Sequence, residues 1–339
     1  MRIHLLPQKP HYYKANLHMH TVLSDGDMTP EETKRAYMAH GYSVVAFTDH
    51  EVMIPHPELT DENFLALTSY ETAIAAEDYR DTDFSFQKTT HLNLYAPENS
   101  LRIPPVFDER TIWPGIGHIR AYVDDEMRKV VFAHTPDCVN RLIAAANEAG
   151  YLVSYNHPVW SCQSYPDYAG LEGVWGVEWY NTGCVIAGYP DTIQPVDDFL
   201  RAGKRVFPLA TDDAHHLKDC FGGWVMIGAD KLTHADIFAA LKQGDFYSST
   251  GPEITEISLE GDILRVACSP AASVLVTTER RFARQAYAQN GVPVTAAEFD
   301  LGDYFRFEAK ENSYFRVTVL DGAGRTAYSR AFFADEWGF

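Results

Sequence analysis

Three stretches of the chain repeat one order of polar and apolar positions. In each, a run with helical spacing of apolar residues is followed by a glycine and then by a short apolar strand. The clearest copy starts at Thr29-Pro30, which predicts a helix N-terminus, and continues past Gly41 into a strand over residues 43–47. The other two copies predict helices followed by strands over residues 151–155 and 205–210. Such helix–strand units predict a parallel sheet.

Four further apolar segments predict additional strands of the same sheet. They span residues 15–20, 64–70, 91–95 and 174–180. With the three repeated strands they make about seven parallel strands, enough to close an α/β barrel whose functional groups lie at the carboxyl ends of the strands.

The pattern changes at about Gly251, where helical spacing disappears. Short alternating segments follow, and the turn Asp321-Gly322-Ala323-Gly324 predicts a hairpin between two of them. The predicted strands span residues 253–261, 263–269, 273–278, 304–310, 314–321 and 326–333. We therefore expect two domains, an α/β domain over residues 1–251 and a small all-β sandwich over residues 252–339. The second contains no histidine.

The composition indicates which binding partners and which cellular compartment are expected. The chain of 339 residues has a net charge of −19 and no run of Lys and Arg, so we expect no extended nucleic acid as a main partner. Five cysteines without a CxxC pair suit a reducing compartment and exclude a thiolate zinc finger. The first residues lack a signal-peptide core, and no apolar run approaches the ~20 residues of a membrane span. These features predict a cytoplasmic protein that does not enter a membrane.

Side chains of metal-ligand type accompany the predicted strands. His18-Met19-His20 places two imidazoles on one face of an extended segment, and Asp25 follows in the next loop. The other candidates stand at or next to later strands: His50, Glu71, His91, His157, Asp213 and His215. Nitrogen and oxygen ligands without thiolates favour Mn, Fe or Zn. Because nine ligands exceed what one ion uses, we expect two to three divalent metal ions.

In this set of motifs the chain resembles the PHP (polymerase and histidinol phosphatase) superfamily. The segment NLHMHTVLSDGD…FTDH looks like its opening, and SYET, HLNLY, NHP and TDDAH follow in order. The resemblance covers roughly residues 14–216 and implies a distorted (βα)7 PHP barrel. The β tail resembles the accessory domain of stand-alone PHP hydrolases.

The resemblance also implies ligands for each ion. Those of the first ion are His18, His20, Glu71 and Asp213. Those of the second ion, which shares Glu71, are His91 and His157. Those of the third ion are Asp25, His50 and His215, which are also the candidate catalytic residues, because a His or Asp beside the metals can protonate a leaving oxygen. Asp25 departs from the histidinol-phosphatase branch, which has histidine there, and resembles the branch of small-molecule and nucleotide phosphoesterases.

The leading hypothesis is a metal-dependent phosphoesterase that acts on a small phosphorylated molecule or nucleotide. One alternative keeps the metals but cleaves a carboxylic or carbamic ester, and another is a non-catalytic, metal-dependent binding protein. Trp160 and Tyr180-Asn181 are candidates for the substrate pocket. The sequence does not decide which cation would bind a phosphate; the candidates are Arg80, Lys88, Arg120 and Arg141.

Overall fold

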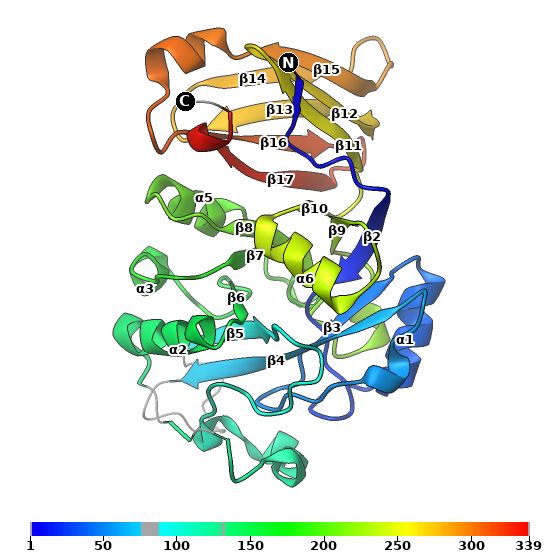
Figure 1. Ribbon diagram of the computed structural model, residues 1–339, viewed down its shortest axis with the longest axis vertical. Coiled ribbons are helices and arrows are strands. Elements are labelled where there is room, and N and C mark those ends of the chain that lie inside the picture. Colours follow the sequence, from blue (N-terminus) through cyan, green and yellow to red (C-terminus); the bar gives the residue numbers. More distant parts are fainter. Residues whose placement is uncertain (1, 76–87, 128, 131–132, 338–339) are drawn as a thin grey trace.

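The computed structural model describes residues 2–337 except 76–87, 128 and 131–132. An α/β unit and a β-rich unit follow one another along the long axis of the molecule, and both chain ends lie in the β-rich unit (Figure 1).

One hydrogen-bonded series of strands forms the sheet of the α/β unit, in the order β10-β9-β2-β3-β4-β5-β6-β7-β8. Each of the seven strands predicted for this region has a counterpart. The bounds are β2 His11–Asn16, β3 Val44–Phe47, β4 Leu65–Ala75, β5 Thr89–Tyr95, β6 Leu152–Tyr155, β7 Gly176–Asn181, β8 Phe207–Thr211, β9 Trp224–Ala229 and β10 Phe246–Ser249. β2 is shifted toward the N-terminus of the predicted strand 15–20, so His18 and His20 lie just beyond its end.

The prediction that these strands are all parallel is wrong for β5. It pairs antiparallel with both β4 and β6, whereas β2–β3–β4 and β6–β7–β8 are parallel. A parallel neighbour needs a crossover connection, and none of the three helix–strand repeats precedes β5. Met19 and Ala214 form one parallel bridge between the chain beyond β2 and the chain beyond β8. The described residues form no longer ladder there, so they do not show the closed (βα)7 barrel.

The helices of the three repeats are confirmed. The first begins at Thr29, whose hydroxyl accepts the Glu32 N–H at 3.2 Å while the Glu32 carboxylate accepts the Thr29 N–H at 2.9 Å. The glycines after the three helices, Gly41, Gly150 and Gly203, all have positive φ. The helices are α1 Pro30–Ala39, η1 Pro57–Leu59, η3 Glu109–Thr111, η4 Pro114–Tyr122, α2 Pro136–Glu148, α3 Tyr165–Tyr168, α4 Thr182–Ile186, α5 Gln194–Arg201, η5 Leu217–Asp219 and α6 His234–Gln243. Across the described part of the chain, none of the helices has the length and apolar character that a membrane crossing needs.

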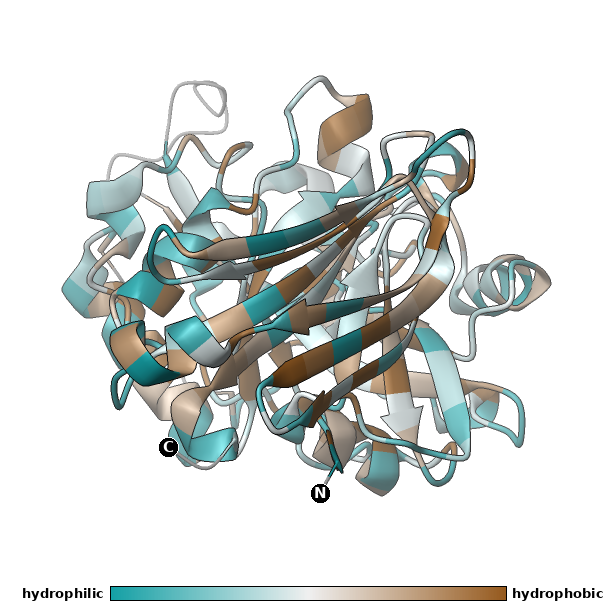
Figure 2. Ribbon diagram, turned by 90° about the horizontal axis from the view of Figure 1, so that it is seen from above, coloured by the Kyte–Doolittle hydropathy of each residue, from teal (hydrophilic) through white to brown (hydrophobic). Residues whose placement is uncertain are grey.

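Two four-stranded sheets form the β-rich unit and enclose an apolar core. One has the order β1-β11-β12-β15, and the other has the order β14-β13-β16-β17. Their strands alternate between hydrophilic and hydrophobic positions (Figure 2). The bounds are β1 Arg2–His4, β11 Ile254–Glu260, β12 Ile263–Ala271, β13 Ser273–Thr278, β14 Ala283–Tyr287, β15 Val294–Asp300, β16 Tyr314–Leu320 and β17 Thr326–Phe333, with a short η7 at Ala334–Glu336.

Several features of this unit differ from the predicted pattern, which has no strands at the positions of β14 and β15. The segment 304–310 is not a strand, because Tyr304 and Phe305 are buried side by side in the helical turn η6 (Tyr304–Glu308) while Phe307 is exposed. β1 pairs with β11, and Leu5 and Leu6 belong to the β core, so the N-terminal residues lie in this unit. β17 also pairs with β10, which joins the second sheet to the sheet of the α/β unit. The domain boundary at residues 251/252 stays a prediction.

Candidate metal centre

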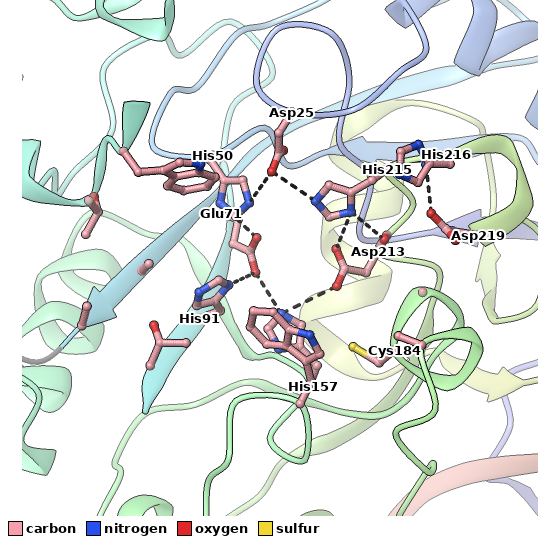
Figure 3. A pocket seen from close by; sticks show the side chains of 18 of the residues that line it. Asp25, His50, Glu71, His91, His157, Cys184, Asp213, His215, His216 and Asp219 are labelled. Carbon is pink, nitrogen blue, oxygen red and sulfur yellow. Dashed lines mark hydrogen bonds and ion pairs between the residues drawn. The ribbon is translucent and has the colours of Figure 1, made fainter. Parts of the chain in front are cut away.

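The other eight residues predicted as ligands lie around the carboxylate of Glu71, and six of them are labelled in Figure 3. Glu71 lies within β4 rather than after it, since the strand continues to Ala75. The others come from β5 and from the loops after β2, β3, β6 and β8, so the sheet brings together residues far apart in the sequence. Seven of the nine side chains are at most 11% exposed, and the two more open ones are Asp25 at 26% and His215 at 30%.

The atoms of the first predicted ligand set form a compact group. His18 Nε2, His20 Nε2 and Asp213 Oδ1 lie 3.2 Å from one another along all three edges. The Glu71 carboxylate lies 3.4 Å from His18 Nε2 and 3.3 Å from His20 Nε2. Metal–ligand bonds of about 2.0–2.2 Å place neighbouring ligand atoms roughly 2.8–3.6 Å apart. His18, His20 and Asp213 therefore fit a single ion, and Glu71 with His18 and His157 forms a second such group.

The Oε1 atom of Glu71 also contacts the residues of the second set. His91 Nδ1 lies 3.1 Å and His157 Nε2 lies 3.3 Å from Glu71 Oε1, and Asn156 Nδ2 donates to the same oxygen at 2.9 Å. Glu71 is thus shared between the first two sets.

Asp25 connects the residues of the third set. Its Oδ2 lies 3.6 Å from His50 Nε2 and 3.4 Å from His215 Nε2, and its Oδ1 lies 3.5 Å from His20 Nδ1. The His20 ring stacks on those of His50 and His215, with centroids 4.4 and 4.2 Å apart. The structure therefore places His20 between the first and third sets, which the motifs did not indicate.

Several buried polar atoms of the cluster make no hydrogen bond, which is a direct test of whether a metal fits. His20 Nδ1, His50 Nδ1 and Asp213 Oδ1 are all of this kind. A buried polar atom without a partner costs roughly 1–3 kcal/mol, so such atoms are rare unless a ligand or ion satisfies them. Their position among imidazoles and carboxylates fits bound cations.

The charges in this buried cluster depend on one another. Burial alone would raise the pKa of Glu71, but the adjacent His18, His91 and His50 hold it well below the usual range of a carboxyl. Burial would likewise raise the pKa of Asp213, but His18 and His20 lower it well below the usual range. Burial lowers the pKa of His50 to about 3, so its imidazole is neutral near pH 7 and can act as a ligand.

A residue that the sequence analysis missed, Glu178 on β7, orients the ligands. Its Oε1 accepts His18 Nδ1–H and the Thr211 hydroxyl, each at 2.7 Å, which leaves His18 Nε2 free to face the cluster. Its Oε2 accepts the His157 backbone N–H at 2.9 Å and Asn181 Nδ2 at 3.0 Å. The available signal was a lone carboxylate inside the apolar strand 174–180.

A cavity of about 600 Å³ opens over the cluster. Trp113, Trp160 and the ammonium-bearing Lys218 line it together with most of the cluster. Three candidate cations are engaged elsewhere: Lys88 with Asp167, Arg120 with Glu109, and Arg141 with Cys138. Arg80 lies outside the described residues. Lys218, which the sequence analysis did not single out, is the only Lys or Arg among the described residues that line the cavity.

Comparisons with known proteins add to this geometry. No protein-family model matches the chain, and no curated protein matches it in sequence. Among solved structures, it aligns with a two-domain protein from Bacteroides vulgatus that contains a predicted PHP-like metal-dependent phosphoesterase. That alignment covers 97% of this chain and 98% of the other, at 14% identity and a TM-score of 0.45. The chain resembles PHP-like metal-dependent phosphoesterases.

Two further solved structures align over parts of the chain. A putative metal-dependent phosphoesterase from Bifidobacterium adolescentis matches 60% of this chain and 88% of its own, at 17% identity and a TM-score of 0.36. A lesion-specific endonuclease from Pyrococcus furiosus matches 68% of this chain and 56% of its own, at 13% identity and a TM-score of 0.38.

Proposed function

We propose that this protein is a metal-dependent phosphoesterase that acts on a small phosphorylated molecule. The observation that carries this proposal is the shared Glu71 carboxylate, which lies within 3.4 Å of nitrogen atoms from five histidines: His18, His20, His50, His91 and His157. A carboxylate so placed can bridge two cations, and its charge offsets their mutual repulsion.

The donor set suits Mn, Fe or Zn. The first set (His18, His20, Glu71 and Asp213) and the second set (Glu71, His91 and His157) would hold two ions, and Asp25, His50 and His215 would hold a third. When bound, such ions make water a nucleophile near neutral pH and neutralise charge on the oxygens of an ester.

The remaining chemistry belongs to the side chains that face the cavity. His215 is the most exposed member of the cluster, and its Nε2 lies 3.4 Å from Asp25 Oδ2, which can hold the ring in position for proton transfer to a leaving oxygen. Lys218 lies in η5, three residues after His215, and lines the cavity. A phosphate has two negative charges for this cation to bind, and a carbamic or carboxylic ester has none.

Hydrolysis of matched phenyl phosphate, phenyl carbamate and phenyl acetate tests the proposal. The protein is stripped of metal and reloaded separately with Mn, Fe and Zn, and its metal content is measured alongside. We expect at least two ions per chain and a kcat/KM for the phosphate at least tenfold above those for the other esters. Lys218→Gln should raise KM for the phosphate about tenfold, and Lys218→Arg should restore it.

The opposite order of activities would support the alternative ester hydrolase. Bound metal with no turnover of any of the three esters would support the non-catalytic binding protein. A metal content below one ion per chain in metal-supplemented protein would contradict the centre itself.

A further inference from the structure

The cavity is much larger than a phosphate group requires. Its volume of about 600 Å³ lies in the range of about 300–1,000 Å³ that holds a drug-sized molecule. The cluster occupies one part of its lining, so the rest is available to the organic part of a substrate.

The face of β4 changes from charged to apolar as it leaves the cluster. Residues two apart on a strand share a face, and Glu71, Ala73 and Ala75 all line the cavity. On β5, His91 and Thr89 share a face and line the cavity, and the Thr89 hydroxyl donates to the Ile74 carbonyl at 3.2 Å. The small uncharged side chains at these positions leave space over the two strands.

Two indoles flank this face. Trp113 packs edge-to-face on His50, with ring centroids 5.0 Å apart, and a Cβ at Gly115 would lie 2.8 Å from its Nε1, so the backbone confines the ring. Trp160 packs edge-to-face on His91 and on His157, at 5.5 and 5.0 Å. Both indoles are only half-buried and line the cavity, so each presents aromatic surface to it.

The opposite rim of the cavity is polar. His216 and Asp219 lie across Glu71 from His50 and His91 (Figure 3), and Lys218 lies between them in the sequence. The cavity is therefore aromatic on one side of the cluster and polar on the other, where Lys218 supplies an ammonium group.

We infer that the substrate is a phosphate monoester of a flat aromatic group, with the aromatic ring held over Ala73 and Ala75 between Trp113 and Trp160. This inference rests on the proposed function, which supplies the phosphate. Indole surfaces favour flat π systems in stacked or edge-to-face contacts over saturated rings of the same size.

A matched pair of substrates tests the inference. Benzyl phosphate and cyclohexylmethyl phosphate have rings of similar size, and both leave as primary alcohols. We expect the metal-loaded protein to have a kcat/KM about tenfold higher for benzyl phosphate, mainly through KM. Trp113→Leu and Trp160→Leu should each remove about threefold or more of this preference, measured as the ratio of kcat/KM for the two substrates in each variant.

A variant that does not touch a histidine guards against damage to the metal centre. Ala75→Leu should fill the space over β4, so it should raise KM for benzyl phosphate at least fivefold and leave methyl phosphate unaffected. A preference below twofold for benzyl over cyclohexylmethyl phosphate in the wild-type protein would overturn the inference. So would an unchanged preference in all three variants.

Calorimetry of two phosphonates, which cannot be hydrolysed, separates this inference from the proposed function. Tighter binding of benzylphosphonate than of cyclohexylmethylphosphonate, without turnover of any phosphate ester, would leave the aromatic subsite standing and refute the phosphoesterase. Equal hydrolysis of benzyl phosphate and cyclohexylmethyl phosphate would refute the aromatic subsite and leave the phosphoesterase standing.

Discussion

Replacing Glu178 with Gln tests whether this carboxylate orients the metal-ligating side chains. The substitution keeps the shape of the side chain but turns one of its two acceptor oxygens into an NH₂ donor. The carboxylate accepts four hydrogen bonds, two on each oxygen. The donors are His18 Nδ1–H, the Thr211 hydroxyl, the His157 backbone N–H and Asn181 Nδ2.

The side-chain amide of the introduced Gln can take two orientations, which differ in free energy. With its NH₂ at the Oε2 position, two donors, the His157 N–H and Asn181 Nδ2, would face a third donor. This orientation leaves buried groups unsatisfied at about 1–3 kcal/mol each. With the NH₂ at the Oε1 position, the Thr211 hydroxyl can reverse, and His18 can accept through Nδ1 if its proton moves to Nε2.

That second orientation is cheaper for the fold but damages the metal centre. A protonated His18 Nε2 has no lone pair to offer a cation, so the first set loses a ligand. We expect metal affinity at this position to fall about 10- to 100-fold, or about 1.4–2.8 kcal/mol, with the thermal unfolding of the metal-free protein little changed. Competition with a chelator of known affinity measures the loss, and elemental analysis reports the stoichiometry.

The control is Glu172→Gln, because Glu172 is exposed and its carboxylate pairs with Lys204 on the surface, at 3.0 Å. Its metal affinity should match that of the wild-type protein. If Glu178→Gln also bound metal within twofold of wild type while remaining folded, the orienting role of Glu178 would be refuted.

Three further predictions address the bridge, a buried carboxyl and the β-rich unit. Glu71→Gln should lose at least one metal and lower turnover by about a hundredfold or more, with the fold retained. The control variant His56→Gln should change metal content and turnover little. Full metal content and activity in Glu71→Gln would contradict the bridging role. Burial raises the pKa of Glu51 to about 8 from its ordinary 4.5, so the folded state binds this proton more tightly and stability should fall as pH rises between these values. Glu51→Gln should reduce that slope in pH-dependent melting of metal-free protein, and an unchanged slope would exclude this cause. We propose that residues 252–339 act as an accessory domain, so deleting them should lower solubility while any soluble product keeps its metal; a soluble, folded product without metal would show that these residues complete the centre.

The sequence predicts the α/β elements well because their signals are local. A cap such as Thr29 with Glu32, an amphipathic run and a left-handed glycine such as Gly41 mark each helix–strand repeat, and the structure follows them. Strand direction depends instead on which strand lies beside which, and β5 shows that an apolar segment does not reveal it. Likewise, three of the four residues 304–307 are aromatic, which favours a strand, but tertiary contacts bury Tyr304 and Phe305 together in a helical turn.

The candidate centre could be predicted because its ligand types are rare in apolar surroundings. All nine residues converge as the motifs indicated, although their role as ligands stays a prediction. Glu178 could not be assigned its role from the sequence, because a single acid on an apolar strand does not reveal its three hydrogen-bond partners from distant segments, His18, His157 and Thr211. Lys218 and Trp113 were missed for a similar reason, since they reach the cavity from short 3₁₀ turns or the loops beside them that have no strong pattern.

The sheet that continues from β10 into β17 restricts how the molecule can move. β10 is hydrogen-bonded to β9 on one side and to β17 on the other, and β1 adds a second connection by pairing with β11. Rotation of the two units about a flexible linker would break the β10–β17 ladder and expose its backbone groups. Entry to the cavity is therefore expected to follow local motion of its rim, such as the segment that carries Trp113, rather than hinge opening between the units. In hydrogen exchange, the amides of β10 and β17 should then be protected together, as one cooperative unit.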